Sequence, residues 1–159
     1  MTGQPNSNFQ LAIDELKESF RADFIGLALV DLKKNQNELK WRYVTGNISS
    51  RYRRIVLHSG KGVAGIVFKT GKQMKIENVE TSVDDNYLYN YPIVVLEKLK
   101  SFGAIPLFQN DHVQGVLLIG YREVNRLTTD KFEQFKHAVG PQFGPFHMKE
   151  RLKDDCIEQ

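Results

Sequence analysis

The chain has 159 residues, which suits one domain with a sizeable buried core. Apolar residues make up 41% of it and charged residues 26%, the proportions of an ordinary soluble globular protein. Basic side chains outnumber acidic ones by 22 to 19, an excess too small to indicate nucleic-acid binding. No stretch approaches the run of about 20 apolar residues that a membrane span needs, and the first residues lack the basic and apolar regions of a signal peptide. We therefore expect neither a nucleic-acid nor a membrane partner.

The first predicted element is a helix over residues 8–21. Ser7 and Gln10 have the spacing of a capping box, which marks a helix start. Apolar side chains then recur at helical spacing on one face, at Phe9, Ile13, Leu16 and Phe20. Residues 1–7 are expected to form a flexible N-terminus.

Two strands are predicted next. Residues 24–32 are almost continuously apolar, as in a central strand. Residues 39–44 alternate between apolar and polar side chains, as in a half-exposed strand. The polar residues 33–38 between them suit a hairpin connection.

Trp41 is the only tryptophan in the chain. On an alternating strand it faces the same side as Leu39 and Tyr43, opposite Arg42. From the sequence alone, the plainest interpretation is an ordinary core residue.

The middle of the chain is composed of shorter pieces. Residues 55–57 are apolar, residues 62–70 predict a short helix closed by a glycine, and residues 74–79 predict a strand. The polar, tyrosine-rich residues 81–91 predict a long loop. Residues 93–100 predict another short helix, which a proline precedes.

A hairpin and a helix complete the predicted domain. Strands over residues 102–108 and 113–121 flank a turn, and a helix begins near Thr128, a good N-cap. Pro141 is expected to kink this helix because proline removes a backbone donor. Apolar side chains lie near one face of the helix at Phe132, Phe135, Val139, Phe143 and Phe146. The order of elements predicts an α+β fold, a central antiparallel sheet with the N- and C-terminal helices packed together on one face.

These elements are expected to form one domain over residues 8–152, followed by a polar tail over residues 153–159. The tail holds the only cysteine, Cys156, which cannot form an internal disulfide. A reducing, cytoplasmic location is the simplest interpretation. We expect a monomer, because packing both terminal helices on the sheet leaves no exposed apolar stripe.

Gly60, Gly62 and Gly65 satisfy the G-x-G-x-x-G pattern. A dinucleotide site would need a parallel strand–helix–strand unit, whereas here the helix lasts about two turns and the later strands form a hairpin. A tight turn into a helix is the better interpretation. The backbone N–H groups at such a helix start favour an anion, unless water or a nearby carbonyl satisfies them.

A basic tract precedes and enters this turn, with Arg51, Arg53, Arg54, His58 and Lys61. A solvated loop is the plainer interpretation, and a partner surface or an anion funnel is the alternative. The four histidines lack the spacing of metal ligands, and no serine or cysteine has an evident base partner. Neither a metal site nor nucleophilic catalysis is expected.

Two segments resemble the signature of the GAF domain family. They are residues 58–79, which include the run Gly62-Val-Ala-Gly-Ile66, and residues 102–119. With the helices at both ends, the resemblance covers about residues 8–150. Within the family, the chain is most similar to the NreA-type nitrate receptors, through residues 39–46, 62–66 and 87–93.

The resemblance implies a small-ligand sensor that binds nitrate without a cofactor, regulates a partner sensor histidine kinase and is not an enzyme. The implied ligand-binding residues are Trp41, Gly62, Val63, Ala64, Gly65, Ile66, Tyr91 and Ile93. Trp41 would form a pocket wall and donate its indole N–H, while the backbone N–H groups at the helix start would hold the anion. Tyr91 and Ile93 are lid candidates, and Tyr87 and Tyr89 are weaker ones.

Other GAF functions remain as alternatives. GAF proteins that reduce methionine sulfoxide use several cysteines, and this chain has one. The Asn-Lys-Phe-Asp-Glu constellation of cyclic-nucleotide GAF domains is not found, and Cys156 is badly placed to attach a bilin. A GAF module for another small ligand, or a pure interaction or dimerisation domain, stays open.

Overall fold

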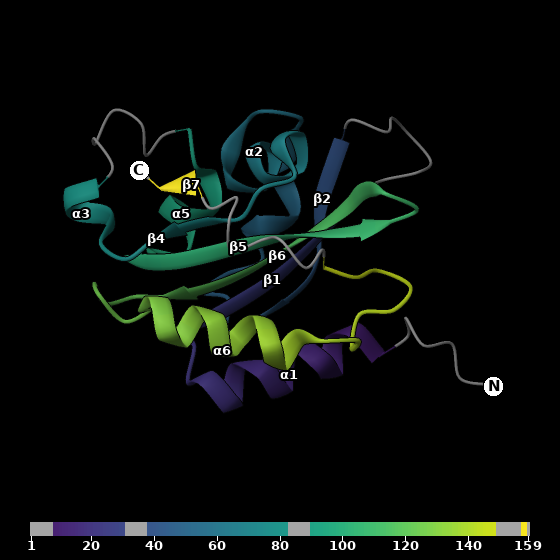
Figure 1. The fold of residues 1–159 in the computed structure, drawn as a ribbon. Helices are drawn as coiled ribbons and strands as arrows, with labels where there is room; N and C mark the ends of the chain where they lie inside the picture. Colours follow the sequence, from purple (N-terminus) through teal and green to yellow (C-terminus); the bar gives the residue numbers. More distant parts are fainter. Residues whose placement is uncertain (1–7, 31–37, 83–89, 149–156, 159) are drawn as a thin grey trace.

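A computed structural model describes residues 8–30, 38–82, 90–148 and 157–158 of the chain. Within these residues a curved sheet separates two layers of helices (Figure 1). The strands are β1 (Phe24–Val30), β2 (Glu38–Thr45), β3 (Val56–His58), β4 (Met74–Ile76), β5 (Ser101–Gln109), β6 (His112–Tyr121) and β7 (Ile157–Glu158). The helices are α1 (Phe9–Phe20), η2 (Arg51–Arg54), α2 (Gly62–Thr70), α3 (Val79–Ser82), α5 (Pro92–Leu96) and α6 (Thr129–Val139).

The strand order in the sheet is β3-β2-β1-β6-β5-β4-β7. Strands β1 to β6 pair antiparallel, and β7 adds a two-residue parallel pairing to β4. The antiparallel pairing confirms the predicted α+β class and excludes the parallel unit that a dinucleotide site requires. No helix in the described part of the chain is both long enough and apolar enough to cross a membrane.

Helices α1 and α6 lie side by side on one face of the sheet (Figure 1). Their predicted apolar stripes meet there, and the rings of Phe20 and Phe135 pack edge to face with centroids 5.6 Å apart. Phe9, Ile13 and Leu16 are buried in the same core cluster. The predicted packing of the two terminal helices on one face is therefore confirmed.

The ends of these helices differ from the predictions. The N-cap of α1 is Asn8, without a side-chain cap, and Gln10 donates to the carbonyl of Val44 at 2.9 Å, while Ser7 lies outside the described residues. Helix α6 ends at Val139, before Pro141, because Gly140 takes a φ of 41°. Pro141 therefore follows the helix and does not kink it.

Strand β2 contains a bulge that sequence periodicity does not reveal. Leu27 of β1 pairs with Tyr43, but the next residue, Ala28, pairs with Trp41, so Arg42 is the extra residue. Side chains on either side of a bulge change faces relative to strict alternation. Tyr43 packs against Phe9 on the helix side, whereas Trp41 stays on the opposite face. The prediction that Trp41 and Tyr43 share a face is wrong.

Three elements in the middle of the chain differ from the sequence prediction. Strand β4 ends at Ile76, the start of the predicted 81–91 loop belongs to α3, and helix α5 stops at Leu96. The predicted hairpin link at 33–38 falls almost entirely outside the described residues, as do residues 83–89.

Candidate ligand site

The start of α2 is held tightly against the end of β3. Gly62, the first helical residue, has a φ of 71°, a left-handed conformation that favours glycine. A Cβ at Gly65 would lie 2.2 Å from the carbonyl oxygen of His58, so only glycine fits there. The amide of Gly60 donates to the carbonyl of Gly65 at 2.8 Å. The glycine pattern thus shapes a strand-to-helix turn.

This turn presents backbone N–H groups at the helix start. The amides of Gly62, Val63 and Ala64 precede the first intrahelical hydrogen bond. Lys61, the N-cap, gives no side-chain cap, and the first turn contains no acidic residue. The partial positive charge of a helix start favours an anion. The geometry is compatible with anion binding by the backbone.

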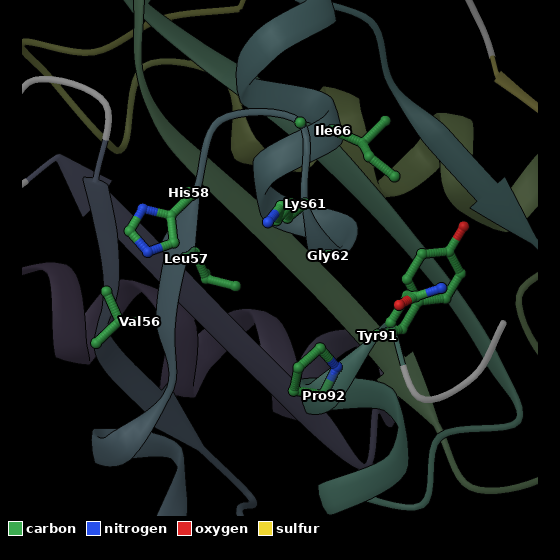
Figure 2. A pocket seen from close by; sticks show the side chains of 10 residues that line it. Val56, Leu57, His58, Lys61, Gly62, Ile66, Tyr91 and Pro92 are labelled. Atoms are coloured by element: carbon green, nitrogen blue, oxygen red, sulfur yellow. The ribbon is translucent and has the colours of Figure 1, made fainter.

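A cavity of about 690 Å³ opens at this helix start. It is lined by Val56, Leu57, His58, Gly60, Lys61, Gly62, Ile66, Asn90, Tyr91 and Pro92. Figure 2 shows Val56, Leu57 and His58 of β3 on one side, with Tyr91 and Pro92 across from them. His58 and Lys61 are exposed at its rim and contribute polar and cationic groups.

Trp41 carries an unusual polar atom. Its side chain is 4% exposed, and its buried indole Nε1 has no hydrogen-bond partner among the described residues. An unsatisfied buried donor costs about 1–3 kcal/mol. Trp41 belongs to the same core cluster as Val63, Ala64, Tyr91 and Ile93. The donor therefore lies on the α2 face of the sheet, where a bound acceptor would remove this cost.

The structure divides the predicted site residues into those that line the cavity and those that do not. Gly62, Ile66 and Tyr91 line the cavity. The others do not line it: Trp41, Val63, Ala64 and Ile93 are buried in the core cluster, and Gly65 lies at the contact with β3. Tyr87 and Tyr89 lie outside the described residues.

Seven of the ten cavity-lining positions were not assigned to the site from the sequence, namely Val56, Leu57, His58, Gly60, Lys61, Asn90 and Pro92. Leu57, Asn90 and Pro92 carried no signal beyond their places in a strand, a loop and a helix start. His58 and Lys61 were noticed only as part of the basic tract. Their shared cavity arises because β3 and α5 flank the start of α2, a juxtaposition that local sequence does not encode.

A buried ion pair fixes the α5 side of the cavity. Glu97, the C-cap of α5, is fully buried, and its Oε1 accepts from Nη2 of Arg122 at 2.7 Å and from the amide of Ile48 at 2.8 Å. Arg122 also donates to the carbonyls of Glu97 and Gly46. Such bonds within a buried network hold α5, and with it Tyr91 and Pro92, against the end of the sheet.

Among the described residues, no group of three or more His, Cys, Asp or Glu side chains could hold a metal ion. The polar groups of the cavity-lining residues are backbone amides, the Asn90 carboxamide, the Tyr91 hydroxyl, a histidine and a lysine, and the Trp41 indole lies in the core cluster of the same sheet face. This set suits the binding of a small anion.

The comparison with protein families decides the fold family. The GAF domain model matches residues 5–140, which is most of the chain. The chain belongs to the GAF domain family.

Solved structures refine this assignment. The chain is similar to a mutated NreA protein from Staphylococcus aureus, altered in its nitrate binding site, with 38% identity, a TM-score of 0.70 and coverage of 74% of this chain and 85% of that one. A second such NreA structure has 33% identity, a TM-score of 0.72 and coverage of 81% and 97%. The free methionine-R-sulfoxide reductase of Neisseria meningitidis, at 19% identity, a TM-score of 0.66 and coverage of 88% and 78%, shares the fold alone. No curated protein matches the chain.

Proposed function

We propose that this GAF protein is a sensor that binds nitrate at the start of α2. The observation that carries the proposal is the buried indole N–H of Trp41, which has no acceptor within the described ranges and lies in one core cluster with Val63 and Ala64 of α2. Similarity to the NreA proteins, which were mutated in a nitrate binding site, supports the choice of ligand.

Nitrate suits the chemistry of this position. It is planar, weakly basic and cheap to dehydrate, so a few amide donors and apolar walls are enough to hold it. The amides of Val63 and Ala64 would donate along the helix axis, and the indole of Trp41 would donate from the sheet. Ile93 and Tyr91 would cover the anion. A fully charged partner is unnecessary, since the helix start itself favours negative charge.

The cavity is much larger than nitrate. A single water occupies about 30 Å³ of liquid, so a four-atom anion would leave most of the 690 Å³ to solvent. In our proposal nitrate occupies the end of the cavity at the start of α2, on the same sheet face as the buried Trp41, and the outer part, with His58 and Lys61 at its rim, is the entrance. The positive charge of Lys61 would raise the local anion concentration at this entrance.

Ligand size limits the affinity. At roughly 1.5 kcal/mol per heavy atom, four atoms bind with no more than about 6 kcal/mol. This corresponds to a dissociation constant no tighter than tens of micromolar. A receptor in this range would report ambient nitrate and would not scavenge traces. We propose that the output is regulation of a partner sensor histidine kinase and that the protein performs no covalent chemistry.

A second candidate follows from the cavity itself. Its volume lies in the range of sites for larger organic ligands, and His58 and Lys61 could pair with a carboxylate there. In this alternative the module binds a larger organic anion at the same helix start. Both candidates share the Trp41 face and differ in the size of the ligand.

Calorimetry separates the two candidates. We expect saturable heat from nitrate in the range from micromolar to millimolar, weaker heat from nitrite, and none from chloride or cyclic nucleotides. A panel of small carboxylates is titrated in parallel. Nitrate heat that is absent up to millimolar ligand would overturn the nitrate proposal, and saturable carboxylate heat would then favour the second candidate.

A further inference from the structure

Exposed apolar side chains gather beside the ligand cavity. Four large apolar residues are the most exposed among those described, and three of them lie in or near η2 and α5: Ile48 at 51%, Val56 at 45% and Val95 at 48%. The amide of Ile48 donates to the Glu97 carboxylate at the end of α5, and Val56 lies two residues after the end of η2. The fourth residue, Leu11, lies on α1.

Val95 lines a groove between η2 and α5. The groove has a volume of about 370 Å³ and is lined by Arg51, Arg54, Ile55, Pro92, Val95 and Leu96. Its floor is apolar, and its two polar residues are both arginines. Solvated apolar grooves of this kind commonly mark interaction sites.

The charge around the groove has one sign. Arg51, Arg53, Arg54 and Lys98 are exposed. The segments that build this face, residues 46–62 and 90–100, contain one acidic residue, the Glu97 that is fully buried against Arg122. In the described portion of the structure, the side chains of Arg51 and Arg54 have no ion-pair partner. The two segments that build this face therefore supply no free carboxylate to pair with the arginines beside the groove.

We propose that this groove docks an acidic amphipathic segment of a partner protein. One or two large apolar side chains of the segment would fill the groove over Val95 and Leu96. Flanking carboxylates would pair with Arg51 and Arg54, since the arginine fork matches a carboxylate with two parallel hydrogen bonds. An apolar centre surrounded by charged pairs is the usual anatomy of a specific interface. This inference does not depend on which ligand occupies the cavity.

Selection from a random peptide library tests the proposal. Phage-displayed peptides of about 12 residues, long enough for a short helix in a groove, are selected on the full chain. We expect enrichment of Leu, Ile, Phe or Trp flanked by Asp or Glu. Val95→Ser and the double variant Arg51→Glu with Arg54→Glu should each weaken an enriched peptide about tenfold. Both changes lie at exposed side chains, and circular dichroism verifies that the variants are folded.

Matched controls lie elsewhere on the surface. Leu11→Ser removes an equally exposed apolar side chain on α1, and Arg21→Glu with Lys72→Glu reverses two exposed charges away from the groove. These variants should bind the peptide like the unchanged protein. Enriched peptides without acidic residues, or peptides that bind the groove variants normally, would overturn the proposal.

Two alternative occupants of the groove, a second copy of the chain and a membrane surface, would give different experimental results. Sedimentation should show a monomer at micromolar protein, and a dimer that Val95→Ser dissociates would assign the groove to a second copy of the chain. Binding to phosphatidylglycerol vesicles that the arginine variant abolishes, without any acidic peptide binding, would assign it to a membrane surface. Either result would contradict a peptide-docking groove.

Discussion

At the scale of single residues, one inserted position decides what Trp41 can do. Arg42 is the extra residue of the β2 bulge, and it sends Tyr43 to the α1 side while Trp41 remains on the α2 side. The indole therefore lies in the cluster that surrounds the start of α2. Its N–H is buried there without an acceptor in the described structure, which is an arrangement that a ligand can stabilise.

Tyr121 shows how a buried polar atom behaves when it is satisfied. Its hydroxyl donates to the carbonyl of Phe20 at 2.6 Å and ties the end of β6 to the end of α1. Burial raises the pKa of Tyr121 to about 12, although Arg126 opposes the shift. The neutral phenol is therefore the form that the fold favours.

This shift predicts a loss of stability in alkali. Since the pKa of Tyr121 is higher in the folded state, its contribution is complete below the unfolded value of about 10 and declines as the pH rises towards about 12. Tyr121→Phe should lower the free energy of unfolding by about 1 kcal/mol near neutral pH, because it removes one hydrogen bond. The variant should also lose less stability than the unchanged protein between about pH 9 and 11.5. Urea unfolding of both proteins measures this, and identical pH slopes would contradict the account.

At the scale of elements, α2 depends on its close approach to β3. The start of the helix carries the proposed anion donors, and Gly65 allows the helix to touch the carbonyl of His58. The contact aligns the helix start with the cavity. Packing at this point therefore supports both the fold and the site.

Gly65→Ala should damage both stability and binding. The added Cβ would lie 2.2 Å from the oxygen of His58, so helix and strand must separate. We expect a loss of about 1–3 kcal/mol in unfolding free energy, as for overpacked cores, and weaker nitrate binding. Lys69→Ala, at an exposed position on the same helix, is the control and should change neither quantity. Normal nitrate affinity in a folded Gly65→Ala protein would argue against a site at this helix start.

Elements with strong local signals were predictable from the sequence. Helix α2 occupies residues 62–70 as predicted, because Gly71 ends it in a left-handed conformation with a φ of 68°. The stripes of α1 and α6 were equally clear. The Arg42 bulge and the early end of α6 at Gly140 were not predictable, since both depend on tertiary pairing and on a backbone choice that periodicity does not record.

The candidate site was predictable only in part. Gly62, Ile66 and Tyr91 line the cavity, and they were named from family resemblance combined with the glycine pattern. The sides formed by Leu57 and Pro92 come from elements distant in sequence that meet across α2. Nothing local in the chain marks those residues as cavity residues. Ligand contacts of any of these residues remain a prediction.

At the scale of the whole molecule, the sheet separates two different cores. One face packs α1 and α6, and the other carries α2 and α5 (Figure 1). The cavity and the groove lie at these two helices. Pro92 lines both the cavity and the groove. Ligand binding on this face can therefore alter the docking surface through α5, within the limit set by the binding energy of the ligand.

The shared Pro92 predicts coupling between the two sites. Saturating nitrate should change the affinity of a groove-binding acidic peptide by about fivefold or more, and the peptide should change nitrate affinity by the same factor. Fluorescence polarisation with and without nitrate measures the first effect, and calorimetry measures the second. Chloride at equal ionic strength is the control. Identical peptide affinity in both salts would show that the two sites are independent.

The central claim, that nitrate accepts a hydrogen bond from Trp41, has a direct spectroscopic test. Because the chain holds one tryptophan, its ¹⁵N–¹H spectrum contains one indole cross-peak. Our account predicts that nitrate shifts this peak downfield along a saturation curve that matches calorimetry, and that Trp41→Phe, which keeps an aromatic wall but lacks the donor, binds about tenfold more weakly. An indole peak that stays in place at saturating nitrate, or unchanged affinity in Trp41→Phe, would contradict it.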